Sequence, residues 1–272
     1  MKVVLFCGGY GMRMRDGTTD LPKPMHPVGP RPLLWHVMRY YAHFGHRDFV
    51  LCLGHGGHHI KDFFLNYAET ASNDFVLRGG DVELLTSDIE DWTITFVHTG
   101  LDSPIGERLR RVRHLVEGEE MFLANYADVL TDLPLDAMIA KFRASDATAA
   151  LLAVPPQQAF HCVELDPDDA VTGISTLRDL PLWENGGYFV LREEVLDYLP
   201  PNGDLVNDTC RVLAKEGRLL GYPYRGWWQP ADTAKERHAL DAAYHAGTRP
   251  WMLWEQPDPS LLWTAADPGL ER

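Results

Sequence analysis

The chain has 272 residues, four cysteines and a formal net charge of −14 at pH 7. This acidic balance argues against a nucleic-acid partner, because phosphate backbones are bound by basic surfaces. The cysteines are widely spaced with no CxxC pair, and no apolar stretch reaches 18 residues, so we expect a soluble, cytoplasmic protein with no membrane segment.

The N-terminal stretch combines an apolar run with a glycine-rich loop. Residues 3–6, VVLF, predict a strand buried on both faces of a parallel sheet. Gly8, Gly9 and Gly11 follow at once, and glycines at the end of a first strand let backbone N–H groups approach a phosphate closely. The loop is not a dinucleotide fingerprint, because Met14 stands where the third glycine is required, and no Gly-Lys-Ser/Thr follows to make a Walker A loop.

Positive charge is concentrated around this loop. The first 47 residues hold seven lysines and arginines against two aspartates, although the whole chain is acidic. Arg13, Arg15 and Lys23 are closest to the glycines. Cations placed locally in an acidic protein are expected at a triphosphate site, and a merely solvated basic surface is the alternative.

Strand and helix patterns alternate along the rest of the chain. Apolar runs predict further strands, and apolar residues at helical spacing predict helices between them, an order typical of a parallel α/β sheet. The predicted strands are 49–53, 94–98, 121–124 and 149–154, and the predicted helices are 32–44, 60–67, 133–142, 193–199, 204–216 and 233–244.

The loop GGYGMR followed by LPKPM resembles the GGxGTR and KP signature of the nucleotidyltransferases that make nucleotide sugars. The similarity runs nearly end to end and is closest to the glucose-1-phosphate cytidylyltransferase branch of these sugar-1-phosphate nucleotidyltransferases. It implies that the loop wraps the nucleotide and that two basic residues bind its phosphates. The residues implied are Phe6, Gly8, Gly9, Gly11 and Met12 around the nucleotide, with Arg13 and Lys23 on the phosphates; Met12 replaces the usual threonine.

The segment SPIGERLRRV resembles the turn and helix that lie beneath the base in related enzymes. The resemblance implies nucleotide contacts from Ser103 and from the backbone of Gly106. Ile105 and Glu107 replace two residues of the family's TGGR motif. The cytidylyltransferase branch implies CTP as the nucleotide. Because of these replacements, GTP, dTTP and UTP are alternatives.

Two further motifs supply carboxylates. NYADVL resembles the family's YGDG, and WQPADT closely matches its WQPxDT, which implies that Asp128 and Asp232 bind Mg²⁺. An alternative for Asp232 is an N-cap of the helix that follows it. Asp132 is the better candidate for capping the predicted helix 133–142.

The acceptor region departs from the family pattern. The resemblance implies sugar-phosphate contacts from Glu184, Asn185 and Gly186, where the family's Asn-Gly-Gly is intact. His161 falls where the family has Arg-Phe-Gly, and Arg178 falls near its Glu-Lys-Pro, whose lysine binds the sugar phosphate. These changes suggest an acceptor other than plain glucose 1-phosphate.

The resemblance implies one nucleotidyltransferase domain over residues 1–255, with a nucleotide-binding part at about 1–130, a sugar-binding part at about 131–232 and an irregular tail at 256–272. The fold class implied is α/β, a Rossmann-like mostly parallel sheet flanked by helices, with a sugar-binding β-rich insertion and a C-terminal helical segment.

The implied reaction is Mg²⁺-dependent transfer of a nucleotidyl group to a sugar 1-phosphate, with Arg13, Lys23, Asp128 and Asp232 as catalytic residues. A non-catalytic regulatory subunit of pyrophosphorylase type is the alternative of a different class. Trp251 and Trp254 near the end suggest packing against a second subunit, and hence a homo-oligomer, with burial on the same chain equally open.

Overall fold

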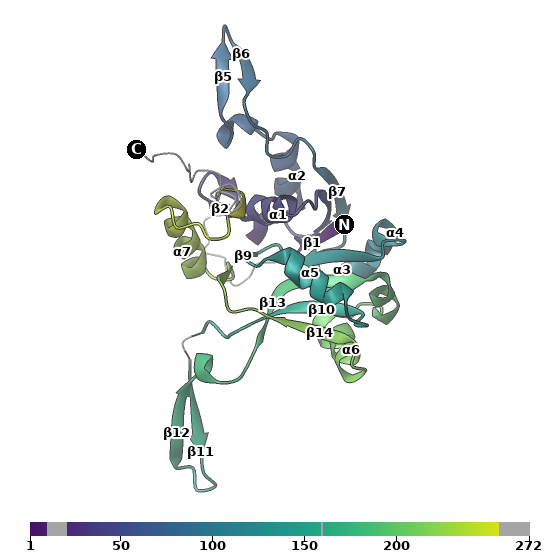
Figure 1. Ribbon diagram of the computed structural model, residues 1–272, viewed down its shortest axis with the longest axis vertical. Coiled ribbons are helices and arrows are strands. Elements are labelled where there is room, and N and C mark those ends of the chain that lie inside the picture. Colours follow the sequence, from purple (N-terminus) through teal and green to yellow (C-terminus); the bar gives the residue numbers. More distant parts are fainter. Residues whose placement is uncertain (10–20, 159, 256–272) are drawn as a thin grey trace, which may run out of the picture.

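The structure is a computed structural model that describes residues 1–9, 21–158 and 160–255. Its centre is a seven-stranded sheet in the order β14-β10-β13-β8-β1-β4-β7 (Figure 1). Every neighbouring pair is parallel except the two made by β13, which confirms the predicted mostly parallel sheet. The strands are β1 (Lys2–Phe6), β4 (Asp48–Leu53), β7 (Thr93–His98), β8 (Met121–Asn125), β10 (Ala149–Val154), β13 (Glu184–Arg192) and β14 (Leu219–Pro223).

Helices cover both faces of the sheet, as the apolar run at β1 requires. Val3 and Leu5 face a core shared with the first long helix, whereas Val4 and Phe6 face a second core with Leu109 on the other side. Strand side chains alternate between the faces, so both faces of β1 are buried. The α-helices are α1 (Leu33–His43), α2 (Gly57–Leu65), α3 (Ile105–Arg111), α4 (Arg113–Val116), α5 (Leu135–Arg143), α6 (Arg211–Lys215) and α7 (Ala234–His245).

Shorter elements complete the described chain. The predicted helix 204–216 is a π-helical segment, η6, that continues into α6, and the predicted helix 193–199 is the 3₁₀ segment η5. The remaining short helices are η2 (Lys23–Met25), η3 (Glu69–Ala71), η4 (Leu177–Asp179), η5 (Glu193–Tyr198), η6 (Leu205–Cys210) and η7 (Leu253–Glu255). The remaining strands are β2 (Pro27–Val28), β3 (Arg31–Pro32), β5 (Phe75–Arg78), β6 (Asp81–Leu84), β9 (Val129–Thr131), β11 (His161–Leu165), β12 (Val171–Thr176) and β15 (Trp228–Pro230). None of the described helices is both long and apolar enough to cross a membrane.

Asp132 does not cap α5, so that prediction is wrong. The cap position belongs to Pro134. The Asp132 carboxylate instead accepts hydrogen bonds from the Tyr224 hydroxyl and, at 2.8 Å, from the backbone N–H of Trp227. It therefore ties β9 to the segment that leads into β15.

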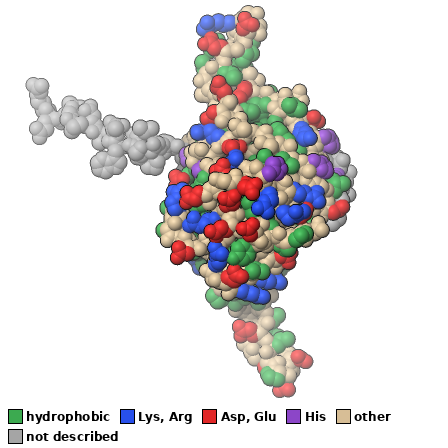
Figure 2. Space-filling model, turned by 90° about the vertical axis from the view of Figure 1, so that its right-hand side faces the viewer, with side chains coloured by type: hydrophobic (Ala, Val, Ile, Leu, Met, Phe, Trp, Pro, Cys, Tyr) green, Lys and Arg blue, Asp and Glu red, His purple; other side chains and the backbone are tan. Residues whose placement is uncertain are grey.

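Two hairpins project from opposite ends of the body, β5–β6 and β11–β12 (Figures 1 and 2). The β11–β12 hairpin is the β-rich insertion that the family resemblance implies, whereas no strand was predicted at β5–β6. Gly79 and Gly80 form its turn at φ +57° and +104°, and a Gly-Gly pair between short strands is a hairpin signal. That signal could have identified the hairpin from the sequence.

The aromatic residues near the end of the described chain pack on the same chain. Trp251 is 1% exposed and stacks on Trp227, with ring centroids 5.2 Å apart. Trp254 is half-buried and meets Trp35 edge to face at 5.8 Å. Of the two alternatives for these tryptophans, burial on the same chain holds, and they give no support to a subunit interface.

Folding stability should depend on pH through His36. Its Nε2 lies 2.9 Å from the Val28 carbonyl, and its Nδ1 accepts from the Trp251 indole N–H at 3.3 Å, so the ring is bonded in its neutral form. Burial is the main cause that lowers the pKa of His36 from 6.5 to about 4, helped by the charges of Arg249 and Arg31. The unfolded chain therefore binds a proton that the folded chain excludes, and the free energy of unfolding should decrease as pH falls from about 6.5 to 4.

The loss assigned to His36 over this pH range is about 3 kcal/mol. Urea unfolding measured at a series of pH values would show it as a slope that His36→Gln flattens. Replacement of the exposed His114 by glutamine is the matched control and should leave the slope unchanged. Equal slopes for wild type and His36→Gln would contradict the assignment.

Candidate active site

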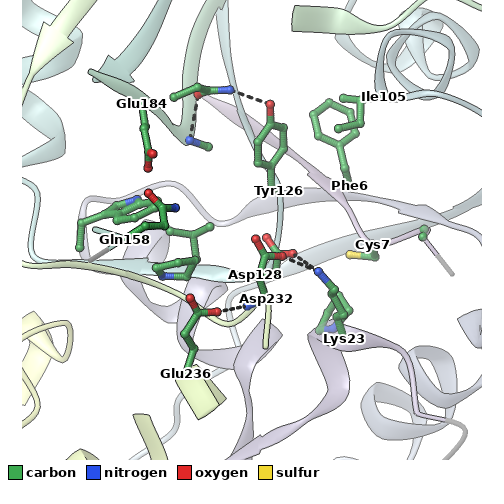
Figure 3. Close-up of a pocket in the computed structure, with 18 residues that line it drawn as sticks. Phe6, Cys7, Lys23, Ile105, Tyr126, Asp128, Gln158, Glu184, Asp232 and Glu236 are labelled. Carbon is green, nitrogen blue, oxygen red and sulfur yellow. Dashed lines mark hydrogen bonds and ion pairs between the residues drawn. The ribbon is translucent and has the colours of Figure 1, made fainter. Parts of the chain in front are cut away.

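A cavity of about 690 Å³ opens at the carboxyl ends of β1 and β8 (Figure 3). Because β13 runs antiparallel to its neighbours, its first residues, Glu184 and Asn185, reach the same edge. In open α/β sheets this edge is where ligands bind. The cavity is lined by Phe6, Cys7, Gly8, Gly9, Lys23, Pro24, Ile105, Tyr126, Asp128, Val129, Gln158, Glu184, Asn185, Gly187, Trp228, Pro230, Asp232 and Glu236.

Asp128 and Asp232 meet in this cavity although 104 residues separate them in the sequence. The antiparallel pairing of β9 with β15 brings them together, and the backbone N–H of Ala231 donates to the Asp128 carbonyl at 2.9 Å. Lys23 Nζ contacts both carboxylates, 2.5 Å from Asp232 Oδ1 and 3.6 Å from Asp128 Oδ2 (Figure 3). Three of the residues implied by the family motifs thus form one cluster.

The Asp232 carboxylate is not used as a helix cap. The N-cap of α7 is Thr233, whose hydroxyl accepts from the Glu236 backbone N–H at 3.2 Å. The Glu236 carboxylate in return accepts from the backbone N–H groups of Asp232 and Thr233, both at 2.9 Å. This capping box leaves the Asp232 side chain directed at Lys23, and the alternative of a capping role for it is wrong.

The electrostatics of the cluster favour a further cation. Burial raises the pKa of Asp128 from 3.8 to about 6, the Lys23 ammonium lowers it, and the Asp232 charge raises it again. Two carboxylates thus converge on a single lysine charge. Mg²⁺ prefers oxygen ligands and is commonly held by one or two carboxylates together with substrate phosphates, so this donor set fits Mg²⁺ with Asp128 and Asp232 as its protein ligands.

The two described glycines of the N-terminal loop serve different purposes. Among the described residues, a Cβ on Gly9 would meet nothing within 4 Å, so none of them separates this backbone from the cavity that it lines. A Cβ on Gly8 would lie 2.1 Å from Arg108 Nη1 and 2.8 Å from the Gly54 nitrogen. Gly8 is therefore required by packing against a buried arginine. The expected nucleotide ligands Gly11, Met12 and Arg13 lie outside the described residues.

The expected base-binding turn reaches the cavity in part. Phe6 and Ile105, the first residue of α3, line it, whereas Ser103 and Gly106 do not. Gly106 is buried against the backbone that precedes η6, where an added Cβ would lie 2.6 Å from the Gly203 carbonyl oxygen. The Ser103 hydroxyl is directed toward Gly100.

Polar groups from β13 and the segment before it form the opposite wall. Asn185 donates to the Tyr126 hydroxyl at 2.7 Å and accepts from the Gly187 N–H at 3.0 Å, which fixes its amide at the rim. Gly186 lies behind the wall, where its carbonyl accepts from the Trp228 indole N–H at 2.9 Å. Tyr126 and Trp228 were not identified as site residues, although both stand within the two carboxylate motifs.

Two of the expected acceptor ligands lie elsewhere in the described chain. His161 begins β11, and Arg178 lies in η4 just after β12, so both belong to the projecting β11–β12 arm. Neither lines the cavity. Glu184 and Asn185 are the members of the expected acceptor set that do.

Comparison with known proteins identifies the family to which the chain belongs. Residues 2–245 match the family described as Nucleotidyl transferase. The chain belongs to the nucleotidyl transferase family. The resemblance inferred from the loop and carboxylate motifs is thereby confirmed.

The chain is also similar to named proteins and to solved structures. The chain is 33% identical to the glucose-1-phosphate cytidylyltransferase of Salmonella typhi, over 94% of this chain and 100% of the relative. It is 24% identical to the mannose-1-phosphate guanylyltransferase of Mycobacterium tuberculosis, over 87% of this chain and 62% of that protein. Among solved structures, apo UDP-glucose pyrophosphorylase is similar in fold, with a TM-score of 0.68, 18% identity, and coverage of 91% of this chain and 99% of the other.

Proposed function

We propose that this nucleotidyltransferase catalyses Mg²⁺-dependent transfer of a cytidylyl group from CTP to a sugar 1-phosphate, giving a CDP-sugar and pyrophosphate. The observation that carries the proposal is the cluster of Asp128, Asp232 and Lys23 beside the open backbone of Gly9 in one large cavity. Similarity to the Salmonella typhi cytidylyltransferase over nearly the whole chain favours CTP as the donor.

The chemistry needs alignment and charge neutralisation more than acid–base catalysis. An oxygen of the sugar phosphate, already ionised at neutral pH, attacks the α-phosphorus of the triphosphate in line, and pyrophosphate leaves. Bound Mg²⁺ would supply charge stabilisation at the α-phosphate. Lys23 is placed to move from the two carboxylates onto a phosphate, and Arg13 is the other proposed triphosphate ligand.

The acceptor would bind along the wall formed by β13. Glu184 carries the same sign of charge as the acceptor's phosphate, so its carboxylate suits the sugar hydroxyls and not the phosphate. Asn185, held by Tyr126, and Gln158 add neutral donors and acceptors beside it. Two neutral amides and one carboxylate form a surface suited to several hydroxyl groups.

Pyrophosphate release measured with Mg²⁺ tests the proposal. CTP, dTTP, UTP and GTP should each be paired with a panel of sugar 1-phosphates that includes glucose 1-phosphate and larger sugars. We expect turnover with CTP and one acceptor, and none when Mg²⁺ is removed with a chelator. Turnover with only one of the other nucleotides would contradict CTP as the donor but support the proposed type of reaction. Tight nucleotide binding with no turnover across the panel would favour a non-catalytic subunit.

The two hairpins favour self-association. Val163, Leu165, Val171 and Ile174 lie on one face of β11–β12 and are 56% to 67% exposed, and β5–β6 exposes Leu77 at 65%. Isolated two-stranded hairpins are marginal in water, so a second copy of the chain would stabilise them by covering these faces. Sedimentation should show a homo-oligomer that Val163→Lys with Ile174→Lys dissociates, and a monomeric wild type would contradict this.

A further inference from the structure

One carboxylate of the cavity has no partner among the described residues. Glu184 is the first residue of β13, and it lines the cavity together with Asn185 and Gln158. Within residues 1–9, 21–158 and 160–255, no group donates a hydrogen bond to this carboxylate and no basic side chain pairs with it. Figure 3 shows the side chain pointing toward Gln158, with no dashed line from its oxygens.

The other carboxylates of the cavity are already engaged. Asp128 and Asp232 share the Lys23 ammonium. The Glu236 carboxylate accepts from two backbone N–H groups. Lys23 is the one basic residue in the described lining, and in Figure 3 it lies on the other side of Asp128 from Glu184. In the described part of the cavity, the charge of Glu184 is therefore not balanced by a protein group.

The position of Glu184 assigns it to the sugar part of the acceptor. The triphosphate and the metal are proposed to bind on the Lys23 side of Asp128, which leaves the Glu184 side for the sugar ring. The neighbouring Asn185 and Gln158 carry neutral amides. Amides can bond the hydroxyl groups of a sugar but cannot balance a charge.

An ammonium group on the sugar would match this carboxylate better than a hydroxyl group. A hydroxyl donates one hydrogen bond and stays neutral, whereas an ammonium has three donors and cancels the charge. When both partners are ionised, the attraction of opposite charges adds to the hydrogen bond. A carboxylate that loses water to a neutral sugar instead keeps an uncompensated charge, which is unfavourable.

We propose that the acceptor is an amino-sugar 1-phosphate whose ammonium group pairs with Glu184. This inference rests on the proposed function, and it names the class of sugar that the cavity selects. The amino group takes no part in the reaction. The phosphate oxygen of the acceptor still attacks the α-phosphorus of the triphosphate, and pyrophosphate still leaves.

Pyrophosphate release with CTP and Mg²⁺ tests the inference. The acceptors are glucose 1-phosphate and the isomers in which one of its hydroxyl groups is replaced by an amino group. Near neutral pH, kcat/KM should be about 10- to 100-fold higher for one amino isomer than for glucose 1-phosphate, the factor expected for a hydrogen bond between charged groups. Glu184→Gln keeps the shape of the side chain without its charge and should remove most of this difference. Glu117→Gln, which changes an exposed carboxylate outside the cavity, is the matched control and should retain it.

A pH series on wild type gives a second readout. The preference for the amino isomer should decline as the pH rises and the amine loses its proton, and acetylation of the amine should abolish it. Should Glu184→Gln not fold, this series decides, because a preference that persists with the deprotonated amine would contradict pairing of charges.

The outcomes separate this inference from the proposed function. Equal kcat/KM for glucose 1-phosphate and every amino isomer would overturn the inference and leave the proposed reaction intact. A preference that Glu184→Gln retains in full would also overturn it. No turnover of CTP with any of these acceptors would contradict the proposed function itself.

Discussion

Replacing Asp128 or Asp232 with asparagine should reduce pyrophosphate release by about 10³-fold, because each substitution removes one of the two anionic oxygen donors available to Mg²⁺. Both carboxylates line the cavity and converge on Lys23, so neither can substitute for the other. The loss should appear mainly in kcat. Steady-state pyrophosphate release, with the substrate pair identified from the panel, measures it.

Stability measurements distinguish a catalytic loss from unfolding. The pKa of Asp128 is raised by burial, which means that its charge destabilises the folded chain at neutral pH. Asp128→Asn should therefore melt at or above the wild-type temperature at pH 7. Asp132→Asn is the matched control: it perturbs a bond to Tyr224 outside the cavity and should lower stability while activity persists. An active Asp128→Asn would refute the metal assignment.

Gly8→Ala should destabilise the fold by about 2–3 kcal/mol, equivalent to a melting temperature about 5–10 °C lower. The added methyl group would overlap the Arg108 guanidinium and the Gly54 nitrogen, and the guanidinium is held by four hydrogen bonds and cannot withdraw freely. Thermal unfolding followed by circular dichroism measures the change.

Gly9→Ala is the matched substitution one residue away. Its methyl group would meet none of the described residues within 4 Å, so the melting temperature should stay close to that of wild type. The methyl group would enter the cavity instead, and nucleotide affinity should fall. Equal melting temperatures for the two alanine variants would show that Arg108 yields and that Gly8 is not required by packing.

The main strands and helices could be predicted because their signals are local. The apolar runs at β1, β4, β8 and β10 each mark a strand buried on both faces, and no distant residue alters that pattern. The direction of β13 could not be read in this way, since an antiparallel central strand has the same apolar composition as a parallel one. That direction nevertheless decides that Glu184 reaches the cavity.

The site residues could be predicted where they lie in motifs that resemble those of the family. Asp128, Asp232 and Lys23 were identified by resemblance and lie together, but nothing local in the sequence says that β9 pairs with β15. Arg108 lies in the segment SPIGERLRRV that resembles the family's TGGR, but only the packing beneath Gly8 shows that its side chain is buried. Whether a charged side chain is buried depends on the tertiary fold and cannot be read from the local sequence.

The pairing of β9 with β15 has a consequence for the order in which the chain acquires activity. These strands are about a hundred residues apart, so their contact closes a long loop, and closing long loops slows folding. The parallel strands β1 and β4 and the helix α1 between them involve shorter separations and can form earlier. During refolding, recovery of the helical signal should precede recovery of pyrophosphate release, because the two carboxylates become neighbours only when the β9–β15 ribbon forms.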